Sequence, residues 1–135
     1  RAGLTPLIAP AGWQMDDGYR TTMRLLGGAE PPTGLFCIRD RVAGGALHAA
    51  AAAGVDVPGE LSVIGFDDED FFAESLTPAL TTIALPHVEM GEGAMSALLD
   101  LLAPDELAEC SAAPSLHVIG CPLVERGSVG IAPLR

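Results

Sequence analysis

Three short loops of this chain carry side chains suited to binding a polyhydroxylated small molecule. The loops hold Trp13, Arg39 and Asp67, and each follows a segment whose apolar pattern predicts a strand. Because the carboxyl ends of parallel strands share one edge of a sheet, we expect these side chains to meet there. An aromatic ring covers the C–H faces of a sugar, while a guanidinium and a carboxylate bind its hydroxyl groups through charge-assisted hydrogen bonds.

Each of these residues also has a purely structural interpretation. A lone tryptophan is more often a packing residue than a ligand contact, so Trp13 can have either role. Position alone favours a solvated Arg39 and an Asp67 that caps a following helix, and residues 68–70 are interpreted as a solvated acidic turn. No nucleophile motif, phosphate loop or metal-ligand spacing stands out, so we expect neither an enzyme nor a site for a cofactor or metal.

Alternating apolar segments predict the elements that position these loops. Strands are expected at 4–9, 34–38, 61–66, 80–85 and 117–124, and helices at about 17–26, 41–53 and 86–102. Asp16 or Asp17 is expected to cap the first helix, Asp40 to cap the second, and Gly54 to end the second in a left-handed conformation. Strands that alternate with helices predict an α/β fold with a doubly wound, mainly parallel sheet.

Shorter segments complete this prediction. The continuous apolar run 34–38 is typical of a strand buried on both faces. The acidic stretch after Asp67 is expected to lead into a short helix that ends near Ser75, and residues 103–115 are expected to form a surface loop.

The composition narrows the class of protein. The chain has 135 residues and a net charge of −11, and all seven of its basic residues are scattered arginines. Without a basic stripe, the chain itself is not expected to bind nucleic acid. Cys37, Cys110 and Cys121 are interpreted as reduced, buried thiols of a cytoplasmic protein, and no apolar run approaches the length that spans a membrane.

Four segments of the chain resemble the lactose/galactose-repressor family of bacterial transcription regulators. They are residues 33–46, residues 54–68, residues 78–83 followed by Gly91, and the ending 123–128. The second segment is the most specific, because it contains Val57-Pro58 and the run Leu-Ser-Val-Ile-Gly-Phe-Asp-Asp over 61–68. The order and spacing of the segments match the family over nearly the whole chain.

The resemblance implies a fold like that of periplasmic sugar-binding proteins, in which two α/β lobes enclose the ligand. Residues 1–135 would form an incomplete C-terminal lobe of the effector-binding domain, with a crossover helix near 87–102 that belongs to the other lobe. The DNA-binding headpiece and the first strand–helix unit of this lobe would lie outside the chain. Such a protein would be a cytoplasmic homodimer, without membrane contact, that senses a sugar or sugar derivative and changes its affinity for operator DNA.

The resemblance also implies roles for individual residues. Asp67 matches the acid that contacts ligand hydroxyl groups, Trp13 matches a position where an aromatic ring stacks on the ligand, and His87 lies where some members place an aromatic at the cleft hinge. Arg39 departs from the family pattern, because an asparagine is usual there. An arginine is longer and charged, so we expect a pocket that prefers an acidic or phosphorylated sugar.

In the family, the helix that matches 41–53 lies at the dimer interface. The resemblance therefore places Gly44, Leu47 and His48 at a contact with the partner, with the small residues allowing two helices to approach closely. The alternative is an ordinary helix packed on its own sheet.

Two other functions compete with a regulator. One is a periplasmic-type sugar-binding protein of a transport system, against which the run 57–68 counts. The other is a phosphate-handling enzyme or receiver domain that uses Asp67 and Asp68 around Mg²⁺, and such sites generally need a lysine, which this chain lacks.

The absent first strand would be central to the sheet. Its absence would leave exposed edges prone to pairing. We therefore expect the chain either to pair strands with another copy or to be part of a longer protein.

Overall fold

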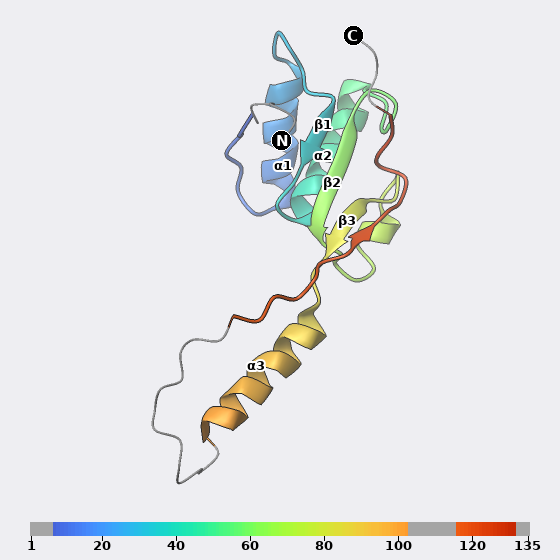
Figure 1. Cartoon of the computed structure of the whole chain (residues 1–135). Coiled ribbons are helices and arrows are strands. Elements are labelled where there is room, and N and C mark those ends of the chain that lie inside the picture. The colour runs from blue at the N-terminus through green and yellow to red at the C-terminus, as the bar shows by residue number, and fades with distance from the viewer. Residues whose placement is uncertain (1–6, 103–115, 132–135) are drawn as a thin grey trace. The chain divides into compact units, whose positions relative to one another are not determined.

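The computed structural model describes residues 7–102 and 116–131, which fall into two units (Figure 1). Unit 1 comprises Arg1–Ala84 and Leu123–Arg135, and unit 2 comprises Leu85–Pro122. The chain therefore passes between the units twice, outward after residue 84 and back before residue 123.

Unit 1 is built on a four-stranded sheet with the order β1-β2-β3-β4. The strands are β1 (Gly34–Phe36), β2 (Ser62–Asp67), β3 (Thr81–Ala84) and β4 (Leu123–Val124). The first three are parallel, and β4 pairs antiparallel with β3. The predicted α/β class with a mainly parallel sheet is confirmed.

Two helices, α1 (Met15–Leu26) and α2 (Asp40–Ala53), pack closely against each other in unit 1. Their contact depends on glycines, because a Cβ on Gly45 would lie 1.9 Å from the Met15 carbonyl oxygen and one on Gly18 would lie 2.1 Å from the Val42 carbonyl oxygen. Gly54 ends α2 with a φ of 71°, as predicted, because only a residue without Cβ adopts this conformation freely.

The predicted helix caps were wrong in detail. Helix α1 begins one residue before Asp16, and Asp17, in its first turn, accepts a hydrogen bond from the Gln14 N–H at 3.0 Å. Asp40 is the first residue of α2 and not its cap, since its carboxylate turns into the protein, and the backbone of Arg39 occupies the cap position.

The core of unit 1 lies between α2 and one face of the sheet. Apolar side chains of α2 meet the alternate residues of β2 and its approach that point the same way. The short 3₁₀ helix η1 (Ala73–Ser75) closes one side of this core through Ala73. The principal members of this core are Val42, Ala46, Leu47, Leu61, Val63 and Leu80.

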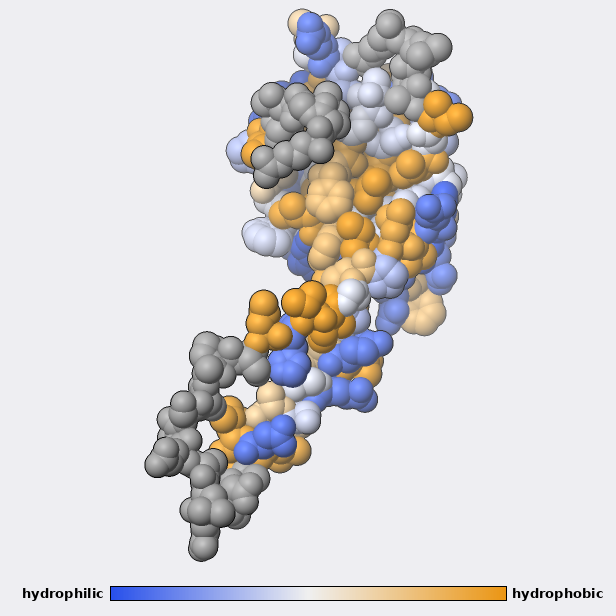
Figure 2. Space-filling model, in the orientation of Figure 1, coloured by the Kyte–Doolittle hydropathy of each residue, from blue (hydrophilic) through white to orange (hydrophobic). Residues whose placement is uncertain are grey.

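The opposite face of the sheet is apolar and open among the described residues. Phe66, Ile83 and Leu123 are register partners across three strands, and Leu123 is 51% exposed. Phe36 on β1 is 60% exposed, so the prediction that 34–38 is buried on both faces was wrong. Figure 2 shows apolar side chains gathered over the strands of unit 1 on the face turned to the viewer.

The segment after β4 is fixed to the start of the sheet by Ser128, which is fully buried. Its hydroxyl donates to the Val63 carbonyl at 2.6 Å and accepts from the Thr81 N–H at 2.8 Å. The same segment donates from Gly127 N–H to the Ala79 carbonyl at 2.9 Å. Ser128 therefore bridges β2 and β3 by hydrogen bonds at the end of the sheet where their direct pairing begins.

Unit 2 contains the helix α3 (His87–Leu102), which begins next to Pro86 nearly as predicted. Its predicted apolar face is open, with Met90, Leu98 and Leu101 all exposed. No described helix is long and apolar enough to cross a membrane.

The first and last predicted strands differ from the observed structure. Residues 7–9 have no regular structure, and residues 4–6 of that predicted strand lie outside the described residues, as does the predicted loop 103–115. The strand predicted at 117–124 is limited to β4, because residues 117–122 have no regular structure.

Candidate functional site

Arg39 and Asp67 meet at the carboxyl edge of the parallel strands. Arg39 follows β1, Asp67 is the last residue of β2, and these two strands are neighbours in the sheet. The Arg39 Nε–H donates to Asp67 Oδ2 at 3.1 Å, with side chains 39% and 19% exposed. The predicted convergence of these two residues is therefore present, while their contact with a ligand stays a prediction.

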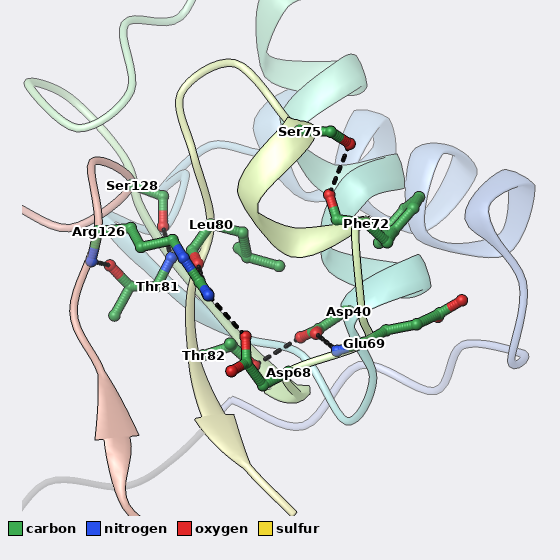
Figure 3. Close-up of polar contacts among 10 residues, drawn as sticks. All are labelled: Asp40, Asp68, Glu69, Phe72, Ser75, Leu80, Thr81, Thr82, Arg126 and Ser128. Carbon is green, nitrogen blue, oxygen red and sulfur yellow. Dashed lines mark hydrogen bonds and ion pairs between the residues drawn. The ribbon is translucent and has the colours of Figure 1, made fainter.

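The loop after Asp67 has an unusual backbone. Asp67 and Asp68 have φ values of 120° and 54°, a region that residues with a Cβ seldom adopt. Their carboxylates point to different arginines, since Asp68 Oδ1 lies 2.8 Å from Arg126 Nη2 (Figure 3). The next residue, Glu69, forms an ion pair with Arg41. The interpretation of 68–70 as a solvated turn was therefore wrong for its first two residues, which are partly buried and paired.

Asp40 ties this loop to the sheet from inside the protein. Its Oδ1 accepts from the Thr82 hydroxyl at 2.6 Å, and its Oδ2 accepts from the Glu69 N–H at 2.8 Å (Figure 3). The carboxylate is fully buried, and this burial raises the pKa of Asp40 above its ordinary value. One buried side chain thus links the start of α2, strand β3 and the loop after β2.

Cysteine chemistry is not favoured near this edge. Cys37, between β1 and α2, is buried, and its burial raises the pKa of the thiol to about 12. The thiol is therefore protonated and a poor nucleophile at neutral pH. Cys121 is exposed, contrary to the prediction, and Cys110 lies outside the described residues.

The predicted contacts of Trp13 and His87 with a ligand stay predictions. Trp13 precedes α1 and is 61% exposed, and α1 starts at the same end of unit 1 as β1 and β2 finish (Figure 1). His87 is the exposed first residue of α3 and belongs to unit 2.

The three residues predicted at a dimer interface have different surroundings. Leu47 is in the core of unit 1, and a Cβ on Gly44 would lie 2.9 Å from Cζ of Phe72, so both are buried by their own chain. The burial of these two residues fits the alternative interpretation, an ordinary helix packed on its own sheet. His48 alone is exposed, with its ring centroid 5.2 Å from that of Tyr19. A dimer contact through α2 therefore remains a prediction carried by His48.

Asp40 and Arg126 are the site-supporting residues that sequence reasoning missed. The sequence does carry a signal for Asp40, namely an acidic residue at the start of a predicted helix. This signal predicts a helix cap, whereas the Asp40 carboxylate binds the Thr82 hydroxyl inside the protein. Arg126 carried none beyond its place in the ending 123–128, since its partner Asp68 is far away in the sequence.

The comparisons with known proteins agree with this fold. Residues 4–129 match the family described as periplasmic binding protein-like domain. The repressor CytR of Escherichia coli (strain K12) is 37% identical over 126 residues, which are 93% of this chain and 35% of that repressor. The chain therefore spans about a third of the length of this curated relative.

Solved structures give the same result. A LacI family transcriptional regulator from Enterococcus faecium with bound ribose is 30% identical with a TM-score of 0.75, over 96% of this chain and 44% of that one. The dimeric Lac repressor with an 11-residue C-terminal deletion is 28% identical with a TM-score of 0.77, over 91% of this chain and 42% of that one. The chain therefore belongs to the periplasmic binding protein-like domain family, and the relative and solved structures named above are transcription regulators with which it shares this domain.

Proposed function

We propose that this chain is the C-terminal part of the effector-binding domain of a transcription regulator, and that it binds a sugar or a related small molecule. The observation that carries the proposal is the Arg39–Asp67 pair at the carboxyl edge of neighbouring parallel strands, where ligands of open α/β sheets bind. Helix α3 would then be the crossover helix of a second lobe. The open apolar surfaces of α3 and of the sheet support this division, because isolated elements do not normally expose such faces.

The effector we propose is a neutral polyhydroxylated molecule. Arg39 suggested an anionic sugar, but its guanidinium already lies against the Asp67 carboxylate. An anionic group bound at Arg39 would lie beside that carboxylate and be repelled by it. A neutral sugar can instead accept from the guanidinium and donate to the carboxylate at the same time. Trp13 would cover an apolar face of the ring, and His87 would contact the ligand from the hinge.

The proposed mechanism is a shift between two arrangements of the lobes. The chain crosses between its two units at two places, so a ligand bound at the edge of unit 1 can favour one arrangement of both crossings. The ligand changes the populations only by its difference in affinity for the two arrangements. A DNA-binding headpiece outside this chain would convert the shift into a change in operator affinity.

The remaining properties follow from the same proposal. The protein would act in the cytoplasm as a homodimer and would have no catalytic role. The competing magnesium-dependent site is less well supported, because Asp67 and Asp68 are each paired with an arginine. A transport-type binding protein would share the fold but lack any link to DNA.

Calorimetric titration of the whole protein that contains this chain tests the proposal. D-Ribose, lactose and ribose 5-phosphate are the probes, and wild type is expected to bind a neutral sugar more tightly than the phosphorylated one. Asp67→Asn is expected to weaken binding about tenfold or more, because it loses a charged hydrogen bond to the ligand.

Asp70→Asn is the matched control for this titration. Asp70 lies in the same loop and is exposed, so its variant should bind as wild type does. Equal binding by Asp67→Asn and wild type would refute the site. Tighter binding of ribose 5-phosphate would refute the neutral effector.

A further inference from the structure

We propose that Arg126 is a positioning residue for the effector loop, and that its pairing with Asp68 holds Asp67 in the orientation that meets the ligand. This inference rests on the proposed function for the role of Asp67. The role of Arg126 in shaping the loop can be tested without any ligand.

The loop needs external support because two consecutive residues with side chains have positive φ. Asp67 and Asp68 have φ values of 120° and 54°, and neither is glycine. Such conformations are intrinsically unfavourable and persist only where the surrounding contacts hold them. Released from those contacts, the loop would relax toward a negative φ and reorient both carboxylates.

Residues at the start of α2 hold the loop at three points. Arg39 pairs with Asp67, the buried Asp40 accepts from the Glu69 N–H at 2.8 Å, and Arg41 pairs with the Glu69 carboxylate. A further contact is the pair between Arg126 Nη2 and Asp68 Oδ1, 2.8 Å apart. Of these contacts only the last comes from the returning segment after β4, so it fixes the middle of the loop independently of α2.

Arg126 is itself well fixed. Its Nη1–H donates to the Leu80 carbonyl at 2.9 Å, and its backbone N–H donates to the Thr81 hydroxyl at 2.9 Å (Figure 3). The side chains of Arg126 and Asp68 are 20% and 26% exposed, so solvent screens the pair less than a surface pair. Arg126 therefore acts as a rigid support and not as a mobile surface charge.

Among the described residues, Arg126 forms neither a hydrogen bond nor an ion pair with Arg39 or Asp67. It lines a hollow of about 170 Å³ whose other lining residues are Asp68, Glu69, Asp70, Phe71 and Glu74, so neither member of the Arg39–Asp67 pair lines this hollow. An effect of Arg126 on the effector would therefore act through the backbone of 67–68, which distinguishes a positioning residue from a ligand contact.

Nuclear magnetic resonance on the whole isotope-labelled protein that contains this chain tests the first part. A positive φ places the amide and Hα protons of a residue close together, so residues 67 and 68 of wild type should show strong intraresidue cross-peaks. Arg126→Gln and Asp68→Asn should each weaken these cross-peaks, and the double variant should resemble the single ones. Arg126→Lys should retain part of the effect, because a point charge replaces the fork of the guanidinium.

Titration of the whole protein with D-ribose tests the second part. Arg126→Gln is expected to lower the ribose affinity about tenfold, the size of effect that one charged hydrogen bond supports, and again the double variant should show no further loss. Arg20→Gln is the matched control, since it removes an exposed arginine–aspartate pair on α1. Its cross-peaks and affinity should equal those of wild type.

The outcomes separate the inference from the proposed function. Strong cross-peaks at residues 67 and 68 in Arg126→Gln would overturn the inference, whatever the protein binds. Weakened cross-peaks with ribose affinity within twofold of wild type would also overturn it, because the loop would not position a ligand group. Absence of neutral-sugar binding by wild type would refute the proposed function, while the cross-peaks would still decide whether Arg126 shapes the loop.

Discussion

Gly65 on β2 leaves the space that the buried carboxylate of Asp40 occupies. A Cβ on Gly65 would lie 2.2 Å from Asp40 Oδ1 and 2.8 Å from Leu80 Cδ2. The residue in the middle of β2 is therefore matched to the first residue of α2, and this match allows Asp40 to reach both Thr82 and the effector loop.

Gly65→Ala should destabilise unit 1 by about 3 kcal/mol, because the added methyl group overlaps two buried side chains. Urea denaturation followed by circular dichroism measures the change. Gly34→Ala is the control, since a Cβ at residue 34 meets nothing within 4 Å. Equal midpoints for the two variants would show that Asp40 moves aside without cost.

Asp40 should make stability depend on pH. Burial raises its pKa in the folded chain above the ordinary value of 3.8, so between the two values the folded chain holds a proton that the unfolded chain has released. Raising the pH across this window therefore disfavours folding. The neighbouring negative charges of Asp67 and Asp68 contribute in the same direction.

Asp40→Asn lacks this titration and provides the measurement. The free energy of unfolding of wild type minus that of the variant should fall as the pH rises above 3.8, and level off once Asp40 is ionised in the folded chain. Urea titrations at several pH values give this difference. A difference that stays constant with pH would show that the folded Asp40 titrates like an exposed carboxyl.

Gly45→Ala should be more damaging than Gly44→Ala, although the residues are adjacent. A Cβ at residue 45 would lie 1.9 Å from a backbone oxygen of α1, whereas one at residue 44 would meet the end of the Phe72 ring at 2.9 Å. A ring can rotate away, but a helix backbone must move as a whole. We expect a cost of about 3 kcal/mol for the first variant and about 1 kcal/mol for the second.

Thermal unfolding of both glycine variants checks this order. The reverse order would contradict this prediction, because it would make Gly44 the glycine that allows the close approach of α1 to α2.

The isolated chain should self-associate through the open side of its sheet. Among the described residues β1 pairs only with β2, and Phe36 beside its free edge is 60% exposed. Light scattering should therefore give a mass above that of the monomer that rises with concentration. Phe36→Lys should lower this mass, because a charge disfavours burial of the edge.

Phe71→Lys is the control for self-association. Phe71 is also exposed, at 83%, but it lies in the loop after β2 and not on the sheet. A stable monomer of the wild-type chain at every concentration would contradict this prediction.

The sequence by itself determined the order and type of most elements. Apolar periodicity placed α2, β2, β3 and α3 within a residue or two, and Gly54 marked the end of α2, because these signals depend on residues close in the chain. The same local reasoning brought Arg39 and Asp67 to one edge, since parallel strands share that edge.

Tertiary structure alone decided how the site is supported and which sheet face is covered. Asp40 lies 42 residues from Thr82, and Asp68 is even farther from Arg126 in the sequence, so no local pattern could reveal either contact. The apolar run 34–38 likewise could not show that one of its faces lacks a covering layer, because hydrophobicity reports a tendency to be buried and not the presence of a partner. Contacts between distant segments depend on the path of the chain in space, and that path is fixed only when the whole sheet assembles.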